Sequence, residues 1–375
     1  MGLFTAFDKV SHEDWRKKIE VDLKGKNFED TLVWKSEQGI DVQPFYNSSN
    51  LPTNNTPLKV NNNWSIRENV FITTCDEANK KALLALKGGA DSICFIGEIS
   101  SKDEMDMLLK DIQIDIIDVN FYSVNIKQIA SLIDLKKGSI SYDFLGDSLF
   151  NSQPINLDDL AELTASNEDI NTITVNGEGY HTAKTTIAQE LAFTLAHGVE
   201  YLNKLTDKGL TANKIANSMQ FTFATGTNYF FEIAKIRAAR ILWQSILNEF
   251  KVENVPMNIH TVTSSVDFTE DNVANNILRN TTKAMSAIIG GCDSLTILAH
   301  DNNKEKADFA NRIARNVQHL LKEESFFDKV NNPADGSYYI ENITHEIVNQ
   351  AWEIFQEIEA KGGYLAALKS NFILS

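Results

Sequence analysis

The chain alternates short β-branched runs with longer segments of helical period along residues 69–300. The runs are eight in number: NVFITT (69–74), DSICFIG (91–97), IIDVNFY (116–122), SISYDFL (139–145), NTITVNG (171–177), SMQFTFATG (218–226), NIHTVTSS (258–265) and DSLTILAH (293–300). Parallel strands need crossover helices, and eight βα units close into a barrel. We therefore predict an α/β fold, a (β/α)8 TIM barrel. An open doubly wound sheet is the alternative, because alternation indicates parallel strands without indicating closure.

The N-terminal part of the chain does not follow this alternation. It holds the amphipathic stretch His12–Lys24, the extended segment Trp34–Tyr46 and an Asn/Pro/Ser-rich linker, NSSNLPTNNTP. We interpret residues 1–62 as an N-terminal extended and helical arm with its linker, and residues 63–375 as the barrel.

Two helix boundaries can be predicted near the C-terminal end. Thr269 is expected to open a helix that stops at the Gly290-Gly291 pair. The amphipathic segment Thr344–Lys361 is expected to form a further helix that closes the domain rather than starting a new one.

The composition excludes several classes of function. The formal net charge of −16 repels phosphate backbones and anionic membrane surfaces, so neither nucleic acid nor membrane is expected as a partner. No apolar stretch is long enough to span a bilayer. The three cysteines, Cys75, Cys94 and Cys292, are widely separated, which supports neither a disulfide framework nor a zinc site. We expect a cytoplasmic protein.

His181 is the residue that the strand pattern singles out. It follows the fifth run, directly after a Gly-Glu-Gly turn, and the C-terminal ends of barrel strands line the active-site face. An imidazole there can pass a proton, donate a hydrogen bond to a carbonyl oxygen or hold a metal. The alternative is a loop histidine whose hydrogen bonds are satisfied by neighbouring backbone.

A metal centre built from histidines is not expected. His181, His197, His260 and His300 all follow or lie within predicted strands and helices, but no two of them have HxH or HExxH spacing. We predict no metal site in this chain.

The sixth and seventh runs are rich in small hydroxyl residues, among them Thr222, Thr225, Thr261, Thr263 and Ser264. TIM-barrel interiors are usually filled by bulky Val, Ile and Leu. If the hydroxyls point inward, the barrel axis is loosely packed and able to admit a long, thin ligand. If they point outward, they only meet helices, and strand alternation alone leaves both orientations open.

Several blocks resemble the barrel domain of the adenosylcobalamin-dependent methylmalonyl-CoA mutase family. NYFFEIAKIRAARILW resembles the family's N-F-F-x-E-I-A-K-x-R-A-A-R-x-L-W block, and the segment beginning HTVTSS resembles its H-x-Q-T-S-G segment. The likeness covers nearly the whole chain, through residues 34–46, 64–67, 228–243, 260–295, 311–324, 333–344 and 351–363.

The resemblance implies a barrel that threads the coenzyme A tail along its axis, with the corrinoid over the strand C-termini. The family's S-G-Y-H motif matches Glu178-Gly179-Tyr180-His181, so His181 inherits the position beside the thioester carbonyl. Tyr180, His260 and Ser264, which lie in the matched segments, are expected to bind substrate by the same resemblance. Radical chemistry of this kind depends on enclosure from solvent.

The chain departs from the pattern of catalytic family members in several places. The long block after the first helix is reduced to GGADSICFIGEISSKDEM, and no tyrosine stands in Arg67–Val70, where the family has a substrate-facing phenol. Val262 replaces the glutamine of H-x-Q-T-S and cannot form its hydrogen bonds. The T-I-Q-N-D-x-x-K-E segment after the fourth strand and the cobalt-ligating D-x-H-x-x-G signature are absent.

These departures resemble the small (beta) subunit of heterodimeric mutases. They imply a non-catalytic chain that stabilises a catalytic large (alpha) subunit, with adenosylcobalamin and acyl-CoA substrate in the complex and no cobalamin-binding domain in this chain. His181 would then be a relic, because one side chain cannot supply an oriented catalytic constellation. The alternatives are an active acyl-CoA mutase barrel that uses a cobalamin domain from a separate chain, and an unrelated CoA-binding barrel enzyme of lyase type.

Overall fold

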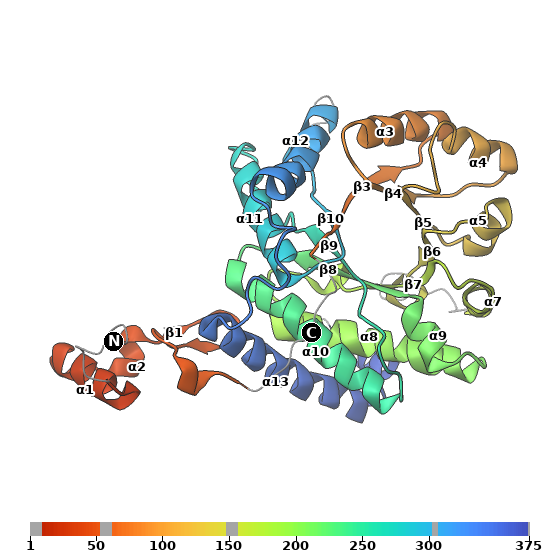
Figure 1. The fold of residues 1–375 in the computed structure, drawn as a ribbon. Coiled ribbons are helices and arrows are strands. Elements are labelled where there is room, and N and C mark those ends of the chain that lie inside the picture. Colours follow the sequence, from red (N-terminus) through yellow and green to blue (C-terminus); the bar gives the residue numbers. More distant parts are fainter. Residues whose placement is uncertain (1–9, 53–61, 148–156, 302–306, 374–375) are drawn as a thin grey trace, which may run out of the picture.

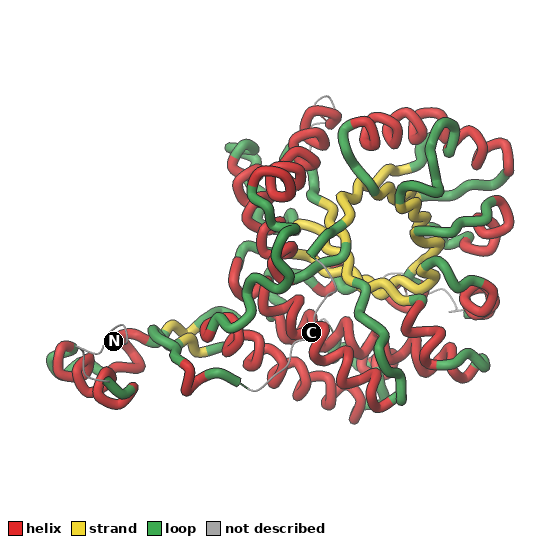
Figure 2. The backbone as a smooth tube through the Cα atoms, viewed as in Figure 1, coloured by secondary structure: helices red, strands yellow, loops and turns green. Residues whose placement is uncertain are grey.

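The architecture is described from a computed structural model of the chain, which describes residues 10–52, 62–147, 157–301 and 307–373. Eight parallel strands form a closed barrel, seen as a ring of strands in Figure 2. In ring order they are β10 (Ser294–Thr296), β3 (Ser65–Phe71), β4 (Ser92–Ile96), β5 (Asp118–Tyr122), β6 (Gly138–Tyr142), β7 (Asn171–Asn176), β8 (Met219–Thr225) and β9 (Ile259–Thr263). The predicted TIM barrel is confirmed, and the open sheet is excluded.

Helices surround the ring on its outside (Figure 1). They are α3 (Cys75–Lys87), α4 (Lys102–Leu108), α5 (Ile126–Leu132), α6 (Phe144–Asp147), α7 (Asp158–Ser166), α8 (Ile187–Asp207), α9 (Ala212–Asn217), α10 (Tyr229–Glu249), α11 (Asn275–Gly290), α12 (Ala307–His319), α13 (Tyr338–Ala360) and α14 (Tyr364–Lys369). The long helix α13 packs outside α8 and α10 and adds a second helical layer to one side of the barrel. No helix in the described part of the chain is long and apolar enough to cross a membrane.

Local sequence explains where the longer helices begin and end. Thr186 and Gln189 form a reciprocal capping box at the start of α8, which satisfies backbone N–H groups that the first turn leaves without partners. Gly291 ends α11 in the left-handed conformation, with φ of 93°, as glycine allows without steric cost.

Several predicted boundaries were wrong, among them the ends of the fourth and eighth runs: β6 stops at Tyr142 and β10 at Thr296. The first barrel strand runs over Ser65–Phe71, not 69–74, because its first half carries Arg67 and Glu68, whose charges concealed a buried strand. Thr269 does not open a helix: its backbone bonds the side chain of Asn276, so residues 269–274 form a loop before α11. The closing helix starts at Tyr338, six residues before the predicted Thr344.

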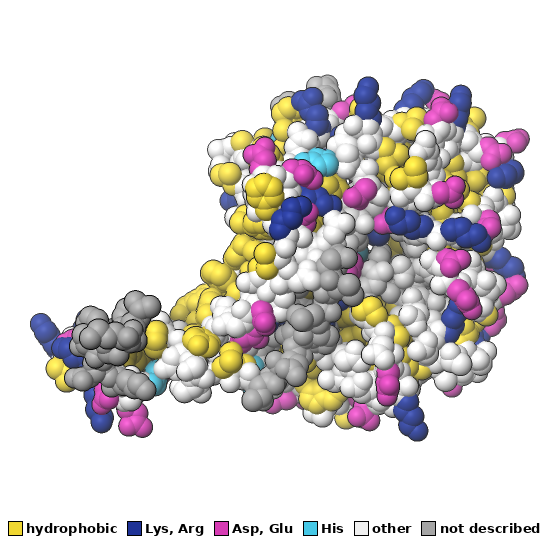
Figure 3. Space-filling view, in the orientation of Figure 1, with side chains coloured by type: hydrophobic (Ala, Val, Ile, Leu, Met, Phe, Trp, Pro, Cys, Tyr) yellow, Lys and Arg dark blue, Asp and Glu magenta, His cyan; other side chains and the backbone are white. Residues whose placement is uncertain are grey.

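The N-terminal arm extends away from the barrel (Figure 1). It consists of α1 (His12–Asp22), α2 (Phe28–Leu32), a two-stranded hairpin of β1 (Trp34–Lys35) and β2 (Asp41–Val42), and the short 3-10 helix η1 (Ser48–Asn50). The hairpin attaches the arm to the barrel, since Trp34 packs edge-on against Phe231 of α10. Helix α1 buries none of its residues. Hydrophobic side chains gather where the arm meets the barrel (Figure 3).

Gly138, at the start of β6, provides a test of barrel closure. Its φ is 107°, and a β-carbon at this position would lie 1.9 Å from the carbonyl oxygen of Val119 on β5. Gly138→Ala should therefore lower the free energy of unfolding by about 4 kcal/mol or more, measured by urea denaturation. Gly209→Ala is the matched control: its φ of 92° is similar, but open space surrounds the added methyl. The control should lose only about 1–2 kcal/mol, and equal losses would contradict the steric argument.

Candidate functional site at the C-terminal end of the barrel

His181 lies just past the C-terminal end of β7. After Asn176 the chain makes one 3-10 turn, η2 (Glu178–Tyr180), and His181 follows it directly. Its Nδ1 lies 3.0 Å from Oε2 of Glu190 on α8, and its side chain is 17% exposed. The barrel topology confirms that His181 follows the C-terminal end of a barrel strand, as predicted. The histidine is paired with a carboxylate, not with the backbone.

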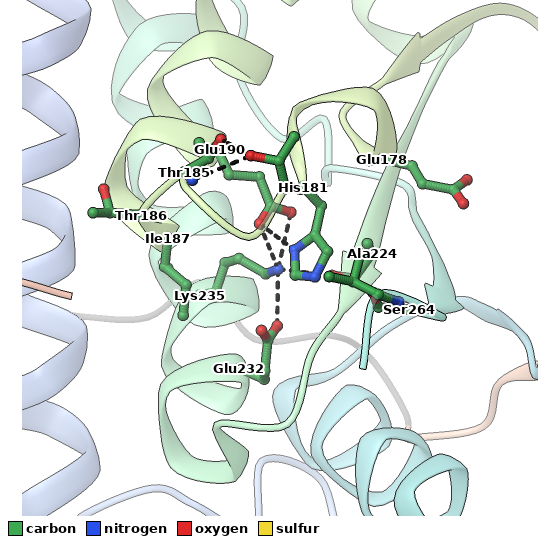
Figure 4. A network of polar contacts seen from close by, with 12 residues as sticks. Glu178, His181, Thr185, Thr186, Ile187, Glu190, Ala224, Glu232, Lys235 and Ser264 are labelled. Carbon is green, nitrogen blue, oxygen red and sulfur yellow. Dashed lines mark hydrogen bonds and ion pairs between the residues drawn. The ribbon is translucent and has the colours of Figure 1, made fainter. Parts of the chain in front are cut away.

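Glu190 belongs to a buried group of charges that also includes Lys235 and Glu232 of α10. The Lys235 Nζ lies 2.9 Å from Glu190 Oε1 and 2.8 Å from Glu232 Oε2, and it donates to the carbonyl oxygen of Ala224 at 2.7 Å. Figure 4 shows the His181 ring and the Lys235 amino group both turned toward Glu190. Two carboxylates thus surround one buried ammonium group.

Opposing effects act on the ionisation of this group, and ion pairing prevails. Burial favours the neutral form of Glu190, but Lys235 and His181 hold the pKa of Glu190 below its usual range. Burial likewise opposes the charge on Lys235, yet Glu190 and Glu232 raise the pKa of Lys235. Both groups are therefore charged at neutral pH.

The carboxylate of Glu190 orients the imidazole. With a carboxylate at Nδ1, the proton of a neutral His181 lies on that nitrogen, and Nε2 is left as an acceptor toward the strand ends. Gly226, after β8, lies against this edge of the ring: a β-carbon there would be 3.2 Å from His181 Cε1 and 3.0 Å from Glu232 Oε1. The arrangement can accept a proton or a hydrogen bond at Nε2, and once protonated it can donate one.

A second polar group fills the barrel interior below this face. The Arg67 guanidinium of β3 donates to Ser92 of β4 at 3.1 Å, to Asn120 of β5 at 3.3 Å and to Gln220 of β8 at 2.8 Å. Since β3 and β8 are separated by β10 and β9 in the ring, the Arg67–Gln220 hydrogen bond crosses the interior. Arg67 is buried, and desolvation lowers its pKa from a very high starting value, so it stays charged.

His260 lies in this interior, near the start of β9. Its Nδ1 is 2.8 Å from the hydroxyl of Ser294 on β10. Desolvation and the nearby Arg67 charge place the pKa of His260 well below its usual range, so the ring is neutral. His260 therefore shares a cavity with Arg67 rather than a contact with His181. Its predicted substrate contact stays a prediction.

Tyr180 is fully buried and belongs to a separate network. Its hydroxyl lies 3.1 Å from Nδ1 of His197 and donates to Tyr364 of α14 at 2.7 Å. His197 in turn lies 3.0 Å from Asp143, at the end of β6, and Tyr201 donates to the same carboxylate. Although burial opposes its charge, Asp143 keeps a lowered pKa because His197 and backbone N–H groups stabilise the anion. These contacts join α14 to the barrel, and the substrate contact predicted for Tyr180 stays a prediction.

Ser264 follows the end of β9, so it lies at the same end of the barrel as His181. Its hydroxyl accepts the N–H of Val266 at 3.2 Å, and its carbonyl oxygen accepts from the buried Lys283 at 2.8 Å. Of the predicted site residues, His181 and Ser264 thus share the C-terminal face. His260 lies inside the barrel, and Tyr180 packs against helices α8 and α14. Whether Ser264 binds substrate stays a prediction.

The hydroxyl residues divide between the two sides of the barrel wall. Thr222 lines the interior together with Ser139, Ser141 and Thr174. Thr261 and Thr263 alternate with the interior-facing His260 and Val262 and therefore face outward. The interior is polar as one alternative expected, but strands other than the sixth and seventh supply most of its hydroxyl groups.

Comparison with known proteins identifies the family of the chain that carries this face. The sequence model of one family, described as methylmalonyl-CoA mutase, matches residues 152–375. The chain belongs to the methylmalonyl-CoA mutase family. The methylmalonyl-CoA mutase small subunit of Porphyromonas gingivalis is 36% identical over 99% of this chain and 66% of its own length. The Streptomyces virginiae small subunit is 30% identical over 100% of this chain and 67% of its own length.

Larger members of the methylmalonyl-CoA mutase family are related as well. The mutase of Rhizobium meliloti is 32% identical over 96% of this chain, which spans 59% of that relative. The chain therefore spans about two thirds, or less, of the length of these curated relatives. Membership in this family, whose named activity is that of an isomerase, and the small-subunit resemblance are both supported by these matches.

Sequence reasoning missed the partners of His181. Glu232 and Lys235 stand three residues apart in the matched block 228–243, and Glu190 interrupts an otherwise apolar stretch of α8. Charged residues in helices that bury most of their surface need partners, which was the signal available. Arg67 gave a similar signal, because it is a charged residue within a strand. That signal is visible only when the strand is taken to start at Ser65.

Removing the buried cation tests the charge group. Lys235→Met should lower the free energy of unfolding by about 3–5 kcal/mol, because Glu190 and Glu232 would lose their shared partner while remaining buried. Urea denaturation at neutral pH measures the loss. Lys80→Met is the control, since the Lys80–Asp76 ion pair is exposed, and its removal should leave stability unchanged. Similar behaviour of both variants would contradict the assignment.

The pH dependence of the Lys235→Met variant tests the same group independently. In the wild type, the lowered pKa of Glu190 and the raised pKa of Lys235 leave their contributions constant from about pH 7.5 to about pH 5. In the variant, burial without a cation raises the pKa of Glu190 above its unfolded value of about 4.3, so stability is lost as the pH rises. The stability gap between wild type and variant should therefore shrink on acidification. A constant gap would show that Glu190 is not the carboxylate that the loss of Lys235 destabilises.

Proposed function

We propose that this chain is the small, non-catalytic subunit of a heterodimeric, adenosylcobalamin-dependent methylmalonyl-CoA mutase of the cytoplasm, and that it stabilises the catalytic large subunit. The complex would interconvert methylmalonyl-CoA and succinyl-CoA. The observation that carries the proposal is the set of hydrogen bonds that Arg67 makes inside the barrel. The family resemblance implies a coenzyme A tail threaded along the barrel axis, and here the Arg67–Gln220 hydrogen bond of 2.8 Å crosses that axis.

The lengths of the alignments support the same proposal. The alignment with the P. gingivalis small subunit runs over 411 positions and that with the R. meliloti mutase over 430, more than the 375 residues of this chain. The relatives therefore carry segments that this chain lacks. The shortened segment 88–105 and the absent segment after the fourth strand lie where the resemblance expects substrate-facing loops.

The residues of this chain do not fit the role of holding the corrinoid. No histidine of the sequence stands in D-x-H-x-x-G. On the C-terminal face, His181 is mostly buried, its Nδ1 is held by Glu190, and its other edge lies against Gly226. We assign this chain no step that involves the cofactor, which would be held by the large subunit.

The arm supports the proposed partner. Val21 of α1 is 71% exposed, and Trp34 and Phe45, further along the arm, are about half exposed. An apolar surface on a segment that extends from the globular part is typical of a protein interface. The names of the relatives, small and large subunits from the same organisms, support a large subunit as the occupant.

Assay of the separated and combined subunits tests the proposed function. The purified chain with methylmalonyl-CoA and adenosylcobalamin should give no succinyl-CoA above background. Co-expression with a large subunit should give a stable complex that turns over substrate and resists heat better than the large subunit alone. Robust turnover by this chain alone would refute the proposal.

One observation favours a second function, an active barrel that borrows a cobalamin domain from a separate chain. The His181–Glu190–Lys235 arrangement orients an imidazole as catalysis requires. His181→Ala in the assembled enzyme discriminates the two functions. The second function expects turnover to fall by about 10²–10⁴-fold, as for the loss of a general acid or base, whereas the small-subunit function expects no change.

A charge on the arm tests the interface. Val21→Asp should weaken association with the large subunit by at least about tenfold, because a carboxylate would be desolvated in the contact. Size-exclusion chromatography or titration calorimetry measures the association. Met107→Asp on α4 is the control, since Met107 is 50% exposed and the helix α4 lies on the opposite side of the barrel from the arm. Neither variant should change the melting temperature of the isolated chain, and equal binding by both would contradict an arm interface.

A further inference from the structure

The interior of the barrel contains a cavity that the proposed function does not use. It has a volume of about 140 Å³, with Arg67 and His260 near the N-terminal ends of the strands and Tyr122 and Glu178 toward the C-terminal ends. Ser141, Thr174 and Thr222 supply hydroxyl groups between these ends, and Ile96 and Val262 supply apolar surface.

No carboxylate among the described residues forms an ion pair with Arg67 inside this cavity. Its three hydrogen bonds go to Ser92, Asn120 and Gln220, which are all uncharged. In the described part of the chain, no ion pair within 4.0 Å includes Arg67, unlike the buried Arg240 and Lys235. Buried charges in proteins are normally paired, because desolvation of an unpaired ion is costly.

Arg67 also retains donors for a ligand. A guanidinium has five N–H donors, of which three are used here, so one N–H on each Nη atom is left. This pair of donors suits a carboxylate, which accepts two parallel hydrogen bonds from an arginine. His260 adds no second positive charge, because burial and Arg67 keep its pKa well below the usual range.

We propose that the barrel interior binds a small monocarboxylate anion of two or three carbons, with its carboxylate on Arg67 and its alkyl group between Ile96 and Val262. The size follows from the cavity, whose volume of about 140 Å³ is small and whose lower end is closed by the Arg67–Gln220 hydrogen bond, so a short anion fits better than a long one. The carboxylate of Glu178 on the cavity wall disfavours a second negative charge, which selects monoanions over dicarboxylates. The site is independent of the proposed subunit role.

Ligand binding to the full-length chain tests the site. Sodium acetate and sodium propionate, at constant ionic strength made up with chloride, should bind saturably in titration calorimetry and raise the melting temperature. Malonate should bind at least about tenfold more weakly than propionate. Arg67→Lys should weaken propionate binding at least about tenfold, because an ammonium group lacks the paired donors. Arg279→Lys, a change outside the cavity on α11, should leave binding unchanged.

A second measurement covers the case in which Arg67→Lys does not fold. In the wild type, propionate should raise the pKa of His260, followed by NMR, because the bound anion neutralises the Arg67 charge. Identical thermal shifts with propionate and chloride, or an unaltered His260 resonance at saturation, would overturn the site. Acetyl-CoA binding as tightly as acetate would overturn it too. It would also contradict the claim that the Arg67–Gln220 hydrogen bond closes the barrel axis to a long ligand. Absence of propionate binding alone would leave the subunit proposal intact.

Discussion

The Arg67 guanidinium determines what the centre of this barrel can hold. Eight strands close a ring just wide enough for side chains to fill, so one long side chain that bonds three other strands occupies the axis at its level. The neutral partners Ser92, Asn120 and Gln220 position the charge without neutralising it. The same group therefore closes the axis to a long ligand and provides a reason for a small anion to bind.

The charges at the opposite end of the barrel have a structural value of their own. Lys235 lies between Glu190 and Glu232, and the loss of Lys235 would leave two buried carboxylates without their shared partner. His181 contacts this group through Glu190. A chain that no longer needs an oriented imidazole for chemistry would still keep the ion pairs that orient it. An ordered His181 is thus compatible with a non-catalytic subunit.

The sequence predicted the number of strands because each run is dominated by β-branched and aromatic residues between turn signals, and the structure confirmed all eight runs as barrel strands. It placed the first strand wrongly because Arg67 and Glu68 read as solvent-exposed charges, whereas one faces the interior and the other pairs with Arg315. His181 was found because a strand end has a known position in a barrel. Glu190 and Lys235 were missed because their contacts join residues 45 positions apart.

The sequence by itself determined the barrel, the family and the position of His181, since hydrophobic period, turn residues and motif spacing are local properties of the chain. Only the tertiary structure decided which way the polar side chains turn: that Thr222 faces the cavity while Thr261 and Thr263 face outward, that Tyr180 bonds His197 and Tyr364 behind the barrel, and that Arg67 reaches Gln220 across it. The physical reason is that a side chain's partner is set by strand register and ring closure, which bring distant residues together and which no local pattern records.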